Sequence, residues 1–399
     1  MTMITAVRSA FPMHRYPQAE LTSKVAELSG LGPVERALLE RLHGNAGVDY
    51  RHTVLPLPEY NGLRGTGLAN DRYIEAAADL GERALRGALE AAGLAGRDLD
   101  LLIVTSVTGV AVPSLDARLI PRLRLRSDVK RLPIFGLGCV AGAAALGRLH
   151  DYLLAWPHHH AALLAVELCS LSWPITQVTT ADLVVSGLFG DGAAALVAAG
   201  GQAAEGPRVV ASRSEVYPDS GDTLGWRLGS DGFRIVLTSE LADVVEQRLS
   251  GSVSSFLAGH GLTVEEITAW VCHPGGPKVI DAIQNSLKLP DSAVELSRRS
   301  LAEVGNLSSA SVLHVLEKTM GANPPPPGSA GLMIGLGPGV AELGAAALVT
   351  GRPTEATWWI LTAGFIWSHH EALLVPRIVP AAERLPYLFT SIVNQVAQA

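Results

Sequence analysis

The stretch RLPIFGLGCVAGAAALGRLHDYLLAW, residues 131–156, places a single cysteine between two patterns. The apolar run 132–135 predicts a strand, and the glycine-rich turn 136–138 follows it. The small residues after Cys139 predict a helix that packs closely against its neighbours. A cysteine at a helix N-terminus lies at the positive end of the dipole, which favours the thiolate and lowers the thiol pKa. We therefore expect Cys139 to be a nucleophile, and the alternative is a small buried core residue.

The composition narrows the class of protein. The 399 residues are 48% hydrophobic and 17% charged, which is ample for a large core. A net charge of −7 without a basic block argues against nucleic acid as a partner. Three cysteines, Cys139, Cys169 and Cys272, are typical of a reducing compartment rather than a disulfide framework. No signal-peptide pattern opens the chain, and the apolar run 356–367 is too short to span a bilayer, so we expect a cytoplasmic protein.

Two segments resemble each other. GLAGRDLDLLIVTSVTG (93–109) and GLTVEEITAWVCHPGG (261–276) both begin with Gly-Leu and continue with acidic residues, an apolar run and a polar, glycine-containing turn. Such units in both halves predict an internally duplicated α/β architecture. We place the halves at residues 1–205 and 206–352. Residues 353–399 form an atypical apolar tail that is rich in tryptophan.

Two further polar residues lie on glycine-flanked turns. His273 follows the apolar run 269–272 and precedes Pro-Gly-Gly, where the alternative is an ordinary turn histidine. Asn306 follows Gly305 and precedes a serine-rich segment, where the alternative is a helix cap. If the halves pack as pseudo-twins, Cys139, His273 and Asn306 converge. A cysteine and a histidine can then form an ion pair, and the histidine and asparagine can donate hydrogen bonds to a developing oxyanion.

Five motifs together resemble one enzyme family. They are, in chain order, GCVAGAAALGRLHD, LFGDGAAAL, HPGGPKVID, GNLSSASV and GLGPG. These motifs are similar to the nucleophile, gatekeeper, histidine, asparagine and cyclisation-pocket segments of the type III polyketide synthases, the chalcone synthase-like family. The resemblance covers roughly residues 30–350. It implies a thiolase-like α/β fold, with two pseudo-duplicated halves in a five-layered αβαβα arrangement.

The resemblance also implies a reaction. Cys139 would hold a starter acyl group as a thioester, and His273 and Asn306 would polarise the thioester carbonyl of malonyl-CoA. Carbon dioxide would leave, and the enolate would attack the acyl group on Cys139. The family is an acyltransferase and a homodimer that uses acyl-CoA and malonyl-CoA as substrates, with neither cofactor nor metal.

Further site residues follow from the same resemblance. We expect Phe189 and Ile235 as gate residues, and Val112, before Pro113, to reach into the partner's cavity. We expect Arg51 to bind the phosphates of coenzyme A, with a solvated arginine as the alternative. The remaining cavity residues would be Val107, Thr108, Cys169 and Ser308, and the cyclisation-pocket loop would be Gly335, Leu336, Gly337, Pro338 and Gly339.

The departures from the family pattern bear on the starter. Cys169, in VELCSLSWP, resembles the bacterial long-chain alkylpyrone synthases, and its small side chain could open a tunnel for an acyl tail. Each buried methylene contributes about 0.8 kcal/mol, so such a tunnel selects chain length. Val107 stands where bacterial tetrahydroxynaphthalene synthases carry a cysteine, which argues against a malonyl starter. We therefore expect a fatty acyl-CoA starter, and release as an alkylpyrone or alkylresorcinol.

Three alternatives remain open. A ketoacyl synthase III-type enzyme would condense once, with carrier-protein substrates. A cysteine hydrolase would use Cys139 and His273 to cleave a thioester, ester or amide. A non-catalytic relative would serve as a binding subunit. The tail 353–399 could cover the acyl tunnel or touch a membrane.

Overall fold

The computed structural model describes most of the chain. The described residues are 1–63, 65–173, 178–201, 206–217, 221, 223–229, 232–238, 240–322, 324–326 and 328–338, with the backbone of two later strands, 344–347 and 359–362. Residues 1–365 form one compact unit. Among the helices described there, none is long and apolar enough to cross a membrane.

The first half of the chain alternates helices and strands. Its strands are β1 (Thr2–Ala10), β2 (His14–Pro17), β3 (Tyr50–Thr53), β4 (Leu101–Thr105), β5 (Lys130–Ile134), β6 (His160–Leu168) and β7 (Asp191–Gly200). Its helices are α1 (Gln18–Leu28), α2 (Pro33–Gly44), α3 (Thr66–Ala91), α4 (Leu115–Leu123), α5 (Ala141–Ala155) and α6 (Thr180–Leu188). Short 3-10 helices connect them: η1 (Leu57–Gly62), η2 (Gly96–Asp98), η3 (Gly138–Val140) and η4 (Cys169–Ser172).

The second half repeats this alternation with fewer elements. Its strands are β8 (Arg208–Val209), β9 (Leu224–Gly229), β10 (Gly232–Leu237), β11 (Ile267–Cys272), β12 (Ala330–Gly335), β13 (Gly344–Ala347) and β14 (Trp359–Thr362). Its helices are α7 (Leu241–Ala258), α8 (Pro277–Leu287), α9 (Asp291–Val304) and α10 (Ser311–Ala322), with the 3-10 helices η5 (Val264–Glu266) and η6 (Ser308–Ala310).

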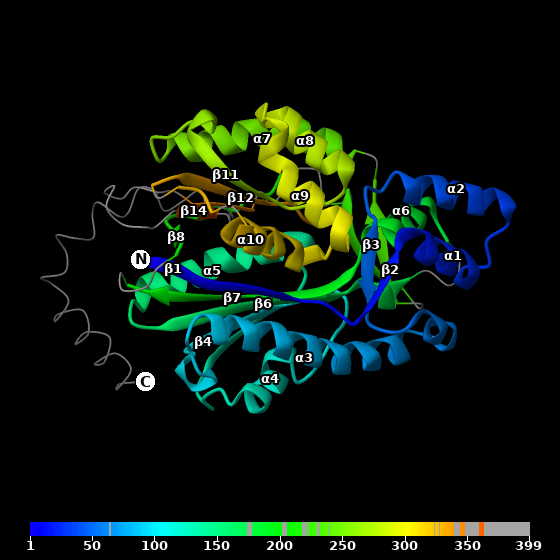
Figure 1. The fold of residues 1–399 in the computed structure, drawn as a ribbon, viewed down its shortest axis with the longest axis horizontal. Helices are drawn as coiled ribbons and strands as arrows, with labels where there is room; N and C mark the ends of the chain where they lie inside the picture. The colour runs from blue at the N-terminus through cyan, green and yellow to red at the C-terminus, as the bar shows by residue number, and fades with distance from the viewer. Residues whose placement is uncertain are drawn as a thin grey trace, which may run out of the picture. The chain divides into compact units, whose positions relative to one another are not determined.

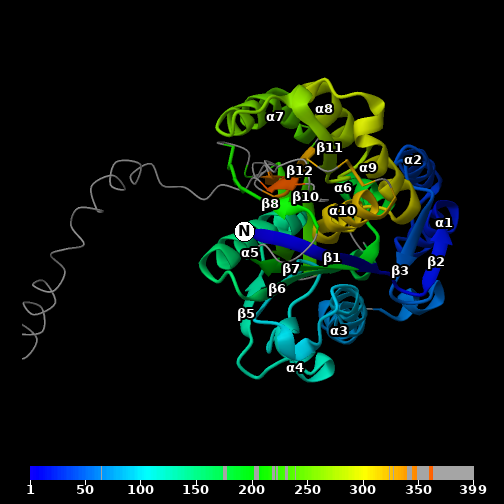
Figure 2. The ribbon, with the colours of Figure 1, turned by 60° about the vertical axis from the view of Figure 1, so that its left-hand side comes forward.

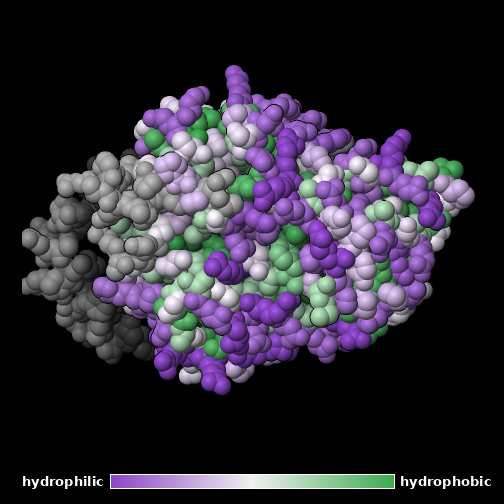
Figure 3. Space-filling view, viewed as in Figure 1, coloured by the Kyte–Doolittle hydropathy of each residue, from purple (hydrophilic) through white to green (hydrophobic). Residues whose placement is uncertain are grey.

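The elements stack in five layers. Figure 1 shows α7 and α8 above β11 and β12, then α5 and α10, then the strands β1, β7, β6 and β4, and finally α3 and α4. One apolar core surrounds α5 and α10 between the strand layers, and a second lies between α3 and the outer face of β6 and β7. The predicted thiolase-like αβαβα fold is confirmed. The face seen in Figure 3 is mostly hydrophilic, as expected when the apolar side chains lie between the layers.

Hydrogen bonds join the two strand layers at one edge. The sheet runs β11-β12-β13-β14-β8-β1-β7-β6-β4-β5, so β14 and β8 link the strands of the two halves. Strand β14 belongs to the segment that we expected to be a tail, and it pairs with β8 and β12. The rest of that segment and the boundary near residue 205 lie outside the described residues, so the domain limits remain predictions.

The two similar segments adopt the same local structure. Gly93 and Gly261 each follow a helix with positive φ values, +70° and +72°, a conformation that glycine adopts without strain. A 3-10 turn comes next in both segments, as η2 and as η5, and each leads into a strand, β4 or β11. The central helices repeat this pairing, because η3 leads into α5 and η6 leads into α10. The duplication therefore brings the starts of α5 and α10 together in the middle layer.

Candidate active site

Cys139 lies in the 3-10 turn η3 that opens α5, and it is 8% exposed. The turn requires glycine at position 138, where φ is +57°. A Cβ on Gly138 would lie 2.5 Å from ring atoms of Pro338, and a Cβ on Gly337 would lie 2.7 Å from the Val140 nitrogen. The GLGPG loop of the second half therefore packs directly against the turn that carries Cys139.

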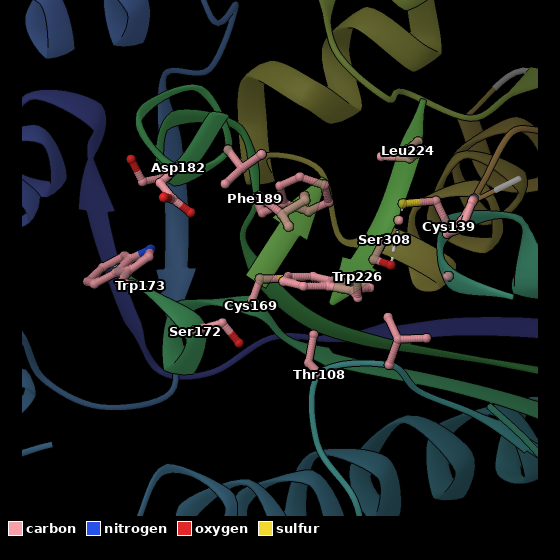
Figure 4. Close-up of a pocket in the computed structure, with 17 residues that line it drawn as sticks. Thr108, Cys139, Cys169, Ser172, Trp173, Asp182, Phe189, Leu224, Trp226 and Ser308 are labelled. Atoms are coloured by element: carbon pink, nitrogen blue, oxygen red, sulfur yellow. Dashed lines mark hydrogen bonds between the residues drawn. The ribbon is translucent and has the colours of Figure 1, made fainter. Parts of the chain in front are cut away.

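Ser308 approaches Cys139 from the matching turn of the second half. The Cys139 Sγ lies 3.5 Å from the Ser308 Oγ, at hydrogen-bonding distance for sulfur (Figure 4). The backbones of the two turns are also in contact, because a Cβ on Gly142 would lie 2.1 Å from the Ser309 carbonyl oxygen. Glycine at position 142 is therefore what allows the first turns of α5 and α10 to meet.

His273 follows β11 and continues its ladder, since its backbone N–H donates to the Ile334 carbonyl at 2.8 Å. The side chain is 2% exposed, and its Nδ1 has no hydrogen-bond partner among the described residues. Burial lowers the pKa of His273 to about 4, so the imidazole is neutral at neutral pH. A neutral, unpartnered ring nitrogen can accept a proton from a neighbouring acid.

Asn306 connects the other residues of the site. Its Oδ1 accepts hydrogen bonds from the Ser308 N–H at 2.8 Å and from the Ser311 hydroxyl at 3.2 Å. Its Nδ2 donates to the Gly275 carbonyl at 3.2 Å, two residues beyond His273. Asn306 thus caps the turn before α10 and also borders the histidine loop, while its role in the reaction stays a prediction. A chain of contacts runs from Cys139 through Ser308 and Asn306 to the His273 loop.

The thiol of Cys139 does not have the lowered pKa that we expected from its helix N-terminus. Burial raises the pKa of Cys139 to about 12, and the charge of Glu167 acts in the same direction. The hydrogen bond with Ser308 lowers it, but by less. Desolvation is therefore the largest influence on the Cys139 thiol, which is neutral at neutral pH, as is the buried imidazole of His273.

Cys139 opens onto a cavity between η3, η4, α6 and the β9–β10 hairpin. The lining residues are Val107, Thr108, Gly138, Cys139, Cys169, Ser172, Trp173, Asp182, Val185, Ser186, Phe189, Leu224, Gly225, Trp226, Ile235, Ser308 and Pro338. The empty space is about 680 Å³ including its opening to solvent. Large aromatic side chains, those of Trp173, Phe189 and Trp226, form part of its wall.

The cavity brings together most of the expected lining residues. The two gate residues both line it: Phe189 directly follows α6, Ile235 lies on β10, and α6 and β10 are in contact. Five expected residues are described but do not line it: His273, Asn306, Gly335, Leu336 and Gly337. Val112 lies outside the cavity with 89% of its surface exposed, and Gly339 is outside the described residues.

Trp226 is a cavity residue that the sequence analysis missed. In Figure 4 its ring lies across the space between Cys169 and Ser308. Trp226 pairs directly with Ile235 in the β9–β10 ladder, and Leu224, two residues earlier, also lines the cavity. The alternation of Leu224 and Trp226 on one face of a strand was the available signal.

Glu167 is a second missed residue. It is fully buried on β6, beside Cys139, where its carboxylate accepts hydrogen bonds from the Ser309 hydroxyl at 2.5 Å, the Thr108 hydroxyl at 3.1 Å and the Val107 N–H at 3.1 Å. Burial raises the pKa of Glu167 to about 7 despite these donors. The carboxyl of Glu167, with a pKa of about 7, therefore lies on β6 close enough to act on the Cys139 thiol. Within the described part of the chain, no three histidine, cysteine or acidic side chains are grouped so that they could hold a metal ion.

The expectation that Arg51 binds the phosphates of coenzyme A is wrong. The Arg51 side chain is 1% exposed, and Nη1 donates to the Phe189 carbonyl at 2.7 Å while Nε donates to the Gln18 side chain at 3.1 Å. A guanidinium enclosed in this way cannot meet the phosphates of coenzyme A at a cavity mouth. The neighbouring tyrosine, histidine and threonine gave no sign of the burial, which depends on contacts from distant parts of the chain.

Comparison with known proteins identifies the family. Residues 1–202 match the N-terminal domain of chalcone and stilbene synthases, and residues 208–345 match the C-terminal domain. The chain belongs to this family. It is a type III polyketide synthase, and the resemblance seen in the five motifs is confirmed.

Bacterial members of the family are particularly similar. The 1,3,6,8-tetrahydroxynaphthalene synthase of Streptomyces peucetius subsp. caesius is 53% identical over 342 residues, which cover 85% of this chain and 90% of that protein. The phloroglucinol synthase of Pseudomonas fluorescens is 31% identical, covering 82% of this chain and 94% of that protein. The crystal structure of the tetrahydroxynaphthalene synthase of Streptomyces coelicolor A3(2) has a TM-score of 0.81 at 29% identity, covering 92% of this chain and 100% of that one.

Proposed function

We propose that this type III polyketide synthase uses malonyl-CoA as starter and as extender and releases a polyhydroxylated naphthalene. The observation that carries the proposal is the Trp226 ring, which lines the cavity of Cys139 between Cys169 and Ser308, where we expect it to limit the room for a long acyl tail. The names of the similar Streptomyces enzymes support the same product class. This proposal replaces the expectation of a fatty starter as the first hypothesis.

In the proposed reaction, Cys139 carries the growing chain as a thioester. The neutral His273 takes the thiol proton as the sulfur attacks the incoming acyl-CoA, so no standing ion pair is needed. His273 and Asn306 then donate hydrogen bonds to the thioester oxygen of malonyl-CoA. As carbon dioxide leaves, the electron pair of the broken bond forms an enolate, and its carbon attacks the thioester carbonyl on Cys139. The bond between that carbonyl and the Cys139 sulfur then breaks, so the Cys139 thiolate leaves and the lengthened chain remains on coenzyme A until it returns to Cys139. The apolar ring of Phe189 disfavours the malonyl carboxylate and so favours its loss.

A long-chain starter is the second candidate. The small side chains of Cys169 and Val107 both line the cavity and leave room on that wall. Displacement of the Trp226 ring would then have to open the path for the tail. In that case the products would be alkylpyrones or alkylresorcinols.

We also propose that the enzyme is a homodimer. Apolar side chains near the exposed edge strand β5 support an interface: Val112 is 89% exposed, Phe135 is 59% exposed, and Val110 and Leu132 are 47% and 40% exposed. Val112 would reach the partner's cavity, as the family resemblance implies. The cytoplasmic location remains a prediction from the sequence.

One incubation separates the candidates. Purified enzyme is given radiolabelled malonyl-CoA, alone and with lauroyl-CoA, beside the Cys139→Ala variant. A naphthalene mass from malonyl-CoA alone, absent from the variant, supports the malonyl starter. Products that carry the lauroyl chain support the long-chain starter instead. Release of free acid without carbon dioxide, or a single condensation, would contradict both.

A further inference from the structure

Arg51 connects two parts of the active site. Its guanidinium donates through Nη1 to the carbonyl of Phe189, the gate residue, at 2.7 Å. Phe189 and Asn306 form a parallel β-bridge, in which the Asn306 N–H donates to the Leu188 carbonyl at 2.8 Å and the Gly190 N–H donates to the Asn306 carbonyl at 2.9 Å. The Arg51 side chain is therefore bound to one side of the β-bridge that joins the Phe189 segment to the Asn306 segment.

The aliphatic stem of Arg51 fills the space beside this bridge. A Cβ on Gly305 would lie 2.9 Å from the Cγ and Cδ of Arg51, and a Cβ on Gly190 would lie 3.6 Å from the Cγ. The glycines before Asn306 and after Phe189 thus leave room for the stem. Arg51 fixes the spacing of the two segments by packing as well as by hydrogen bonding.

A second hydrogen bond fixes the plane of the guanidinium. Nε donates to the Gln18 Oε1 at 3.1 Å, and the Gln18 Nε2 donates to the Gly187 carbonyl at 2.7 Å, on the helix that leads to Phe189. The fork of Arg51 is therefore held between Gln18 and Phe189. A lysine would have to reach both acceptors from one nitrogen, whereas Arg51 reaches them from two nitrogens of a rigid planar fork.

The buried charge of Arg51 is balanced by Asp191. Burial lowers the pKa of Arg51 to about 10 and the nearby Asp191 opposes this change, so the guanidinium stays charged at neutral pH. Asp191 accepts hydrogen bonds from the Ser170 N–H at 2.8 Å and from the Val54 N–H at 2.7 Å. Ser170 follows Cys169 on the cavity wall. Asp191 therefore acts on Arg51 through its charge, while its own hydrogen bonds hold the backbone at Ser170 and Val54.

We propose that Arg51 is a positioning residue, which sets the place of the Phe189 gate relative to Asn306 and so the rate of productive condensation. The burial of Arg51 keeps its guanidinium from touching substrate. The proposal rests on malonyl-CoA condensation as the reaction, whichever starter is used. A shift of gate and asparagine on the order of 1 Å is expected to slow the chemical step while leaving the thiol intact.

The test uses the full-length Arg51→Lys variant, with Arg86→Lys as a matched control on the exposed face of α3. Arg51→Lys keeps the positive charge near Asp191, so we expect its melting temperature to stay within about 5 °C of wild type. We expect kcat for condensation to fall about 10- to 100-fold, with less than about a threefold change in KM for malonyl-CoA. Alkylation of Cys139 by iodoacetamide, followed on its peptide by mass spectrometry, should not change. Arg86→Lys should match wild type in every measurement.

Gln18→Leu is the second variant, because it removes the acceptor of Nε and leaves the charge pair in place. It should lower kcat about 3- to 10-fold in the same way. Wild-type turnover with Arg51→Lys or Gln18→Leu would overturn the proposal. So would a parallel loss of melting temperature, Cys139 alkylation and kcat, which indicates a purely structural role. The assay uses whichever starter wild type accepts, so a wrong starter assignment shows in wild type and a wrong role for Arg51 shows in the variants.

Discussion

Cys139 and Ser308 occupy equivalent places in the duplicated fold, on the 3-10 turns that open α5 and α10, and their side chains meet at 3.5 Å. One half thus supplies the nucleophile and the other supplies a hydroxyl that points at it. Burial raises the pKa of the Cys139 thiol, so a hydrogen-bond donor to the thiolate matters for how readily the thiol ionises. In the neutral state the Cys139 thiol donates to the Ser308 hydroxyl, and once the thiol has ionised the hydroxyl can turn and donate to the thiolate.

The first prediction concerns this hydroxyl. Ser308→Ala removes the hydrogen bond that lowers the Cys139 pKa, which corresponds to about 0.5–1.5 kcal/mol of thiolate stabilisation. We expect alkylation of Cys139 by iodoacetamide at pH 8 to slow about 3- to 10-fold. The measurement follows the Cys139 peptide, since Cys169 and Cys272 also carry thiols. Ser23→Ala, on the exposed face of α1, is the control. Equal rates in the two variants would show that Ser308 does not stabilise the thiolate.

The second prediction concerns the pH dependence of stability. The pKa of Glu167 is raised from 4.5 to about 7, so folding favours its protonated form. This contribution to stability is complete below about pH 4.5 and is lost as the pH rises through about 7, amounting to about 3 kcal/mol. Glu167→Gln cannot ionise, so its free energy of unfolding should fall less between pH 5 and pH 8 than that of wild type.

Urea unfolding at several pH values measures this difference. The comparison uses the slope of unfolding free energy against pH, not its level, because the amide of glutamine also changes the hydrogen bonds with Ser309 and Val107. The raised pKa of Asp191 adds a similar slope to both proteins and cancels in the comparison. Parallel curves for wild type and Glu167→Gln would contradict the assignment of a neutral-range pKa to Glu167.

Local sequence pointed to three polar residues of the site but left an ordinary structural role open for each. Cys139, His273 and Asn306 each follow a strand or helix end close to a glycine, and such patterns are readable within about ten residues. Only the five motifs together assigned these residues, and the gate residue Phe189, to a polyketide synthase site, and their roles in the reaction stay predictions. The structure brings the turns of Cys139 and Asn306 together because the duplication places α5 and α10 side by side.

The residues that the sequence analysis missed or placed wrongly depend on partners that are distant in the chain. Arg51 is buried because Phe189 and Asp191, about 140 residues away, receive its hydrogen bond and balance its charge. An arginine in a short polar strand otherwise predicts exposure. Trp226 lines the cavity because the hairpin register pairs it with Ile235, and register cannot be read from one strand alone.

The third prediction tests the role of Trp226 in starter choice. Trp226→Ala removes a large ring from the cavity wall beside Cys169. We expect the ratio of turnover with lauroyl-CoA to turnover with malonyl-CoA alone to rise about 10-fold or more, because each additional accommodated methylene contributes about 0.8 kcal/mol. Product masses measure the ratio. Trp156→Ala, at a half-exposed tryptophan outside the cavity, should leave it unchanged. An unchanged ratio in Trp226→Ala would exclude the ring as the limit on the starter.

The fourth prediction compares two glycines in helices. A Cβ on Gly142 would lie 2.1 Å from the Ser309 carbonyl oxygen, and a backbone atom cannot move aside without displacing η6. Gly142→Ala should therefore separate the turns of Cys139 and Ser308, with a loss of about 2–4 kcal/mol in stability and of most condensation activity. Gly251→Ala, in α7, meets no atom within 4 Å and should instead stabilise the protein by about 0.5–1 kcal/mol.

Thermal unfolding and turnover of the two variants give the result. The opposite signs separate steric contact from helix propensity, because both changes add the same methyl group to a helix. If Gly142→Ala were as stable and as active as Gly251→Ala, the turns of α5 and α10 could not be in backbone contact. The meeting of Cys139 and Ser308 would then need another explanation than the packing of two equivalent helix ends.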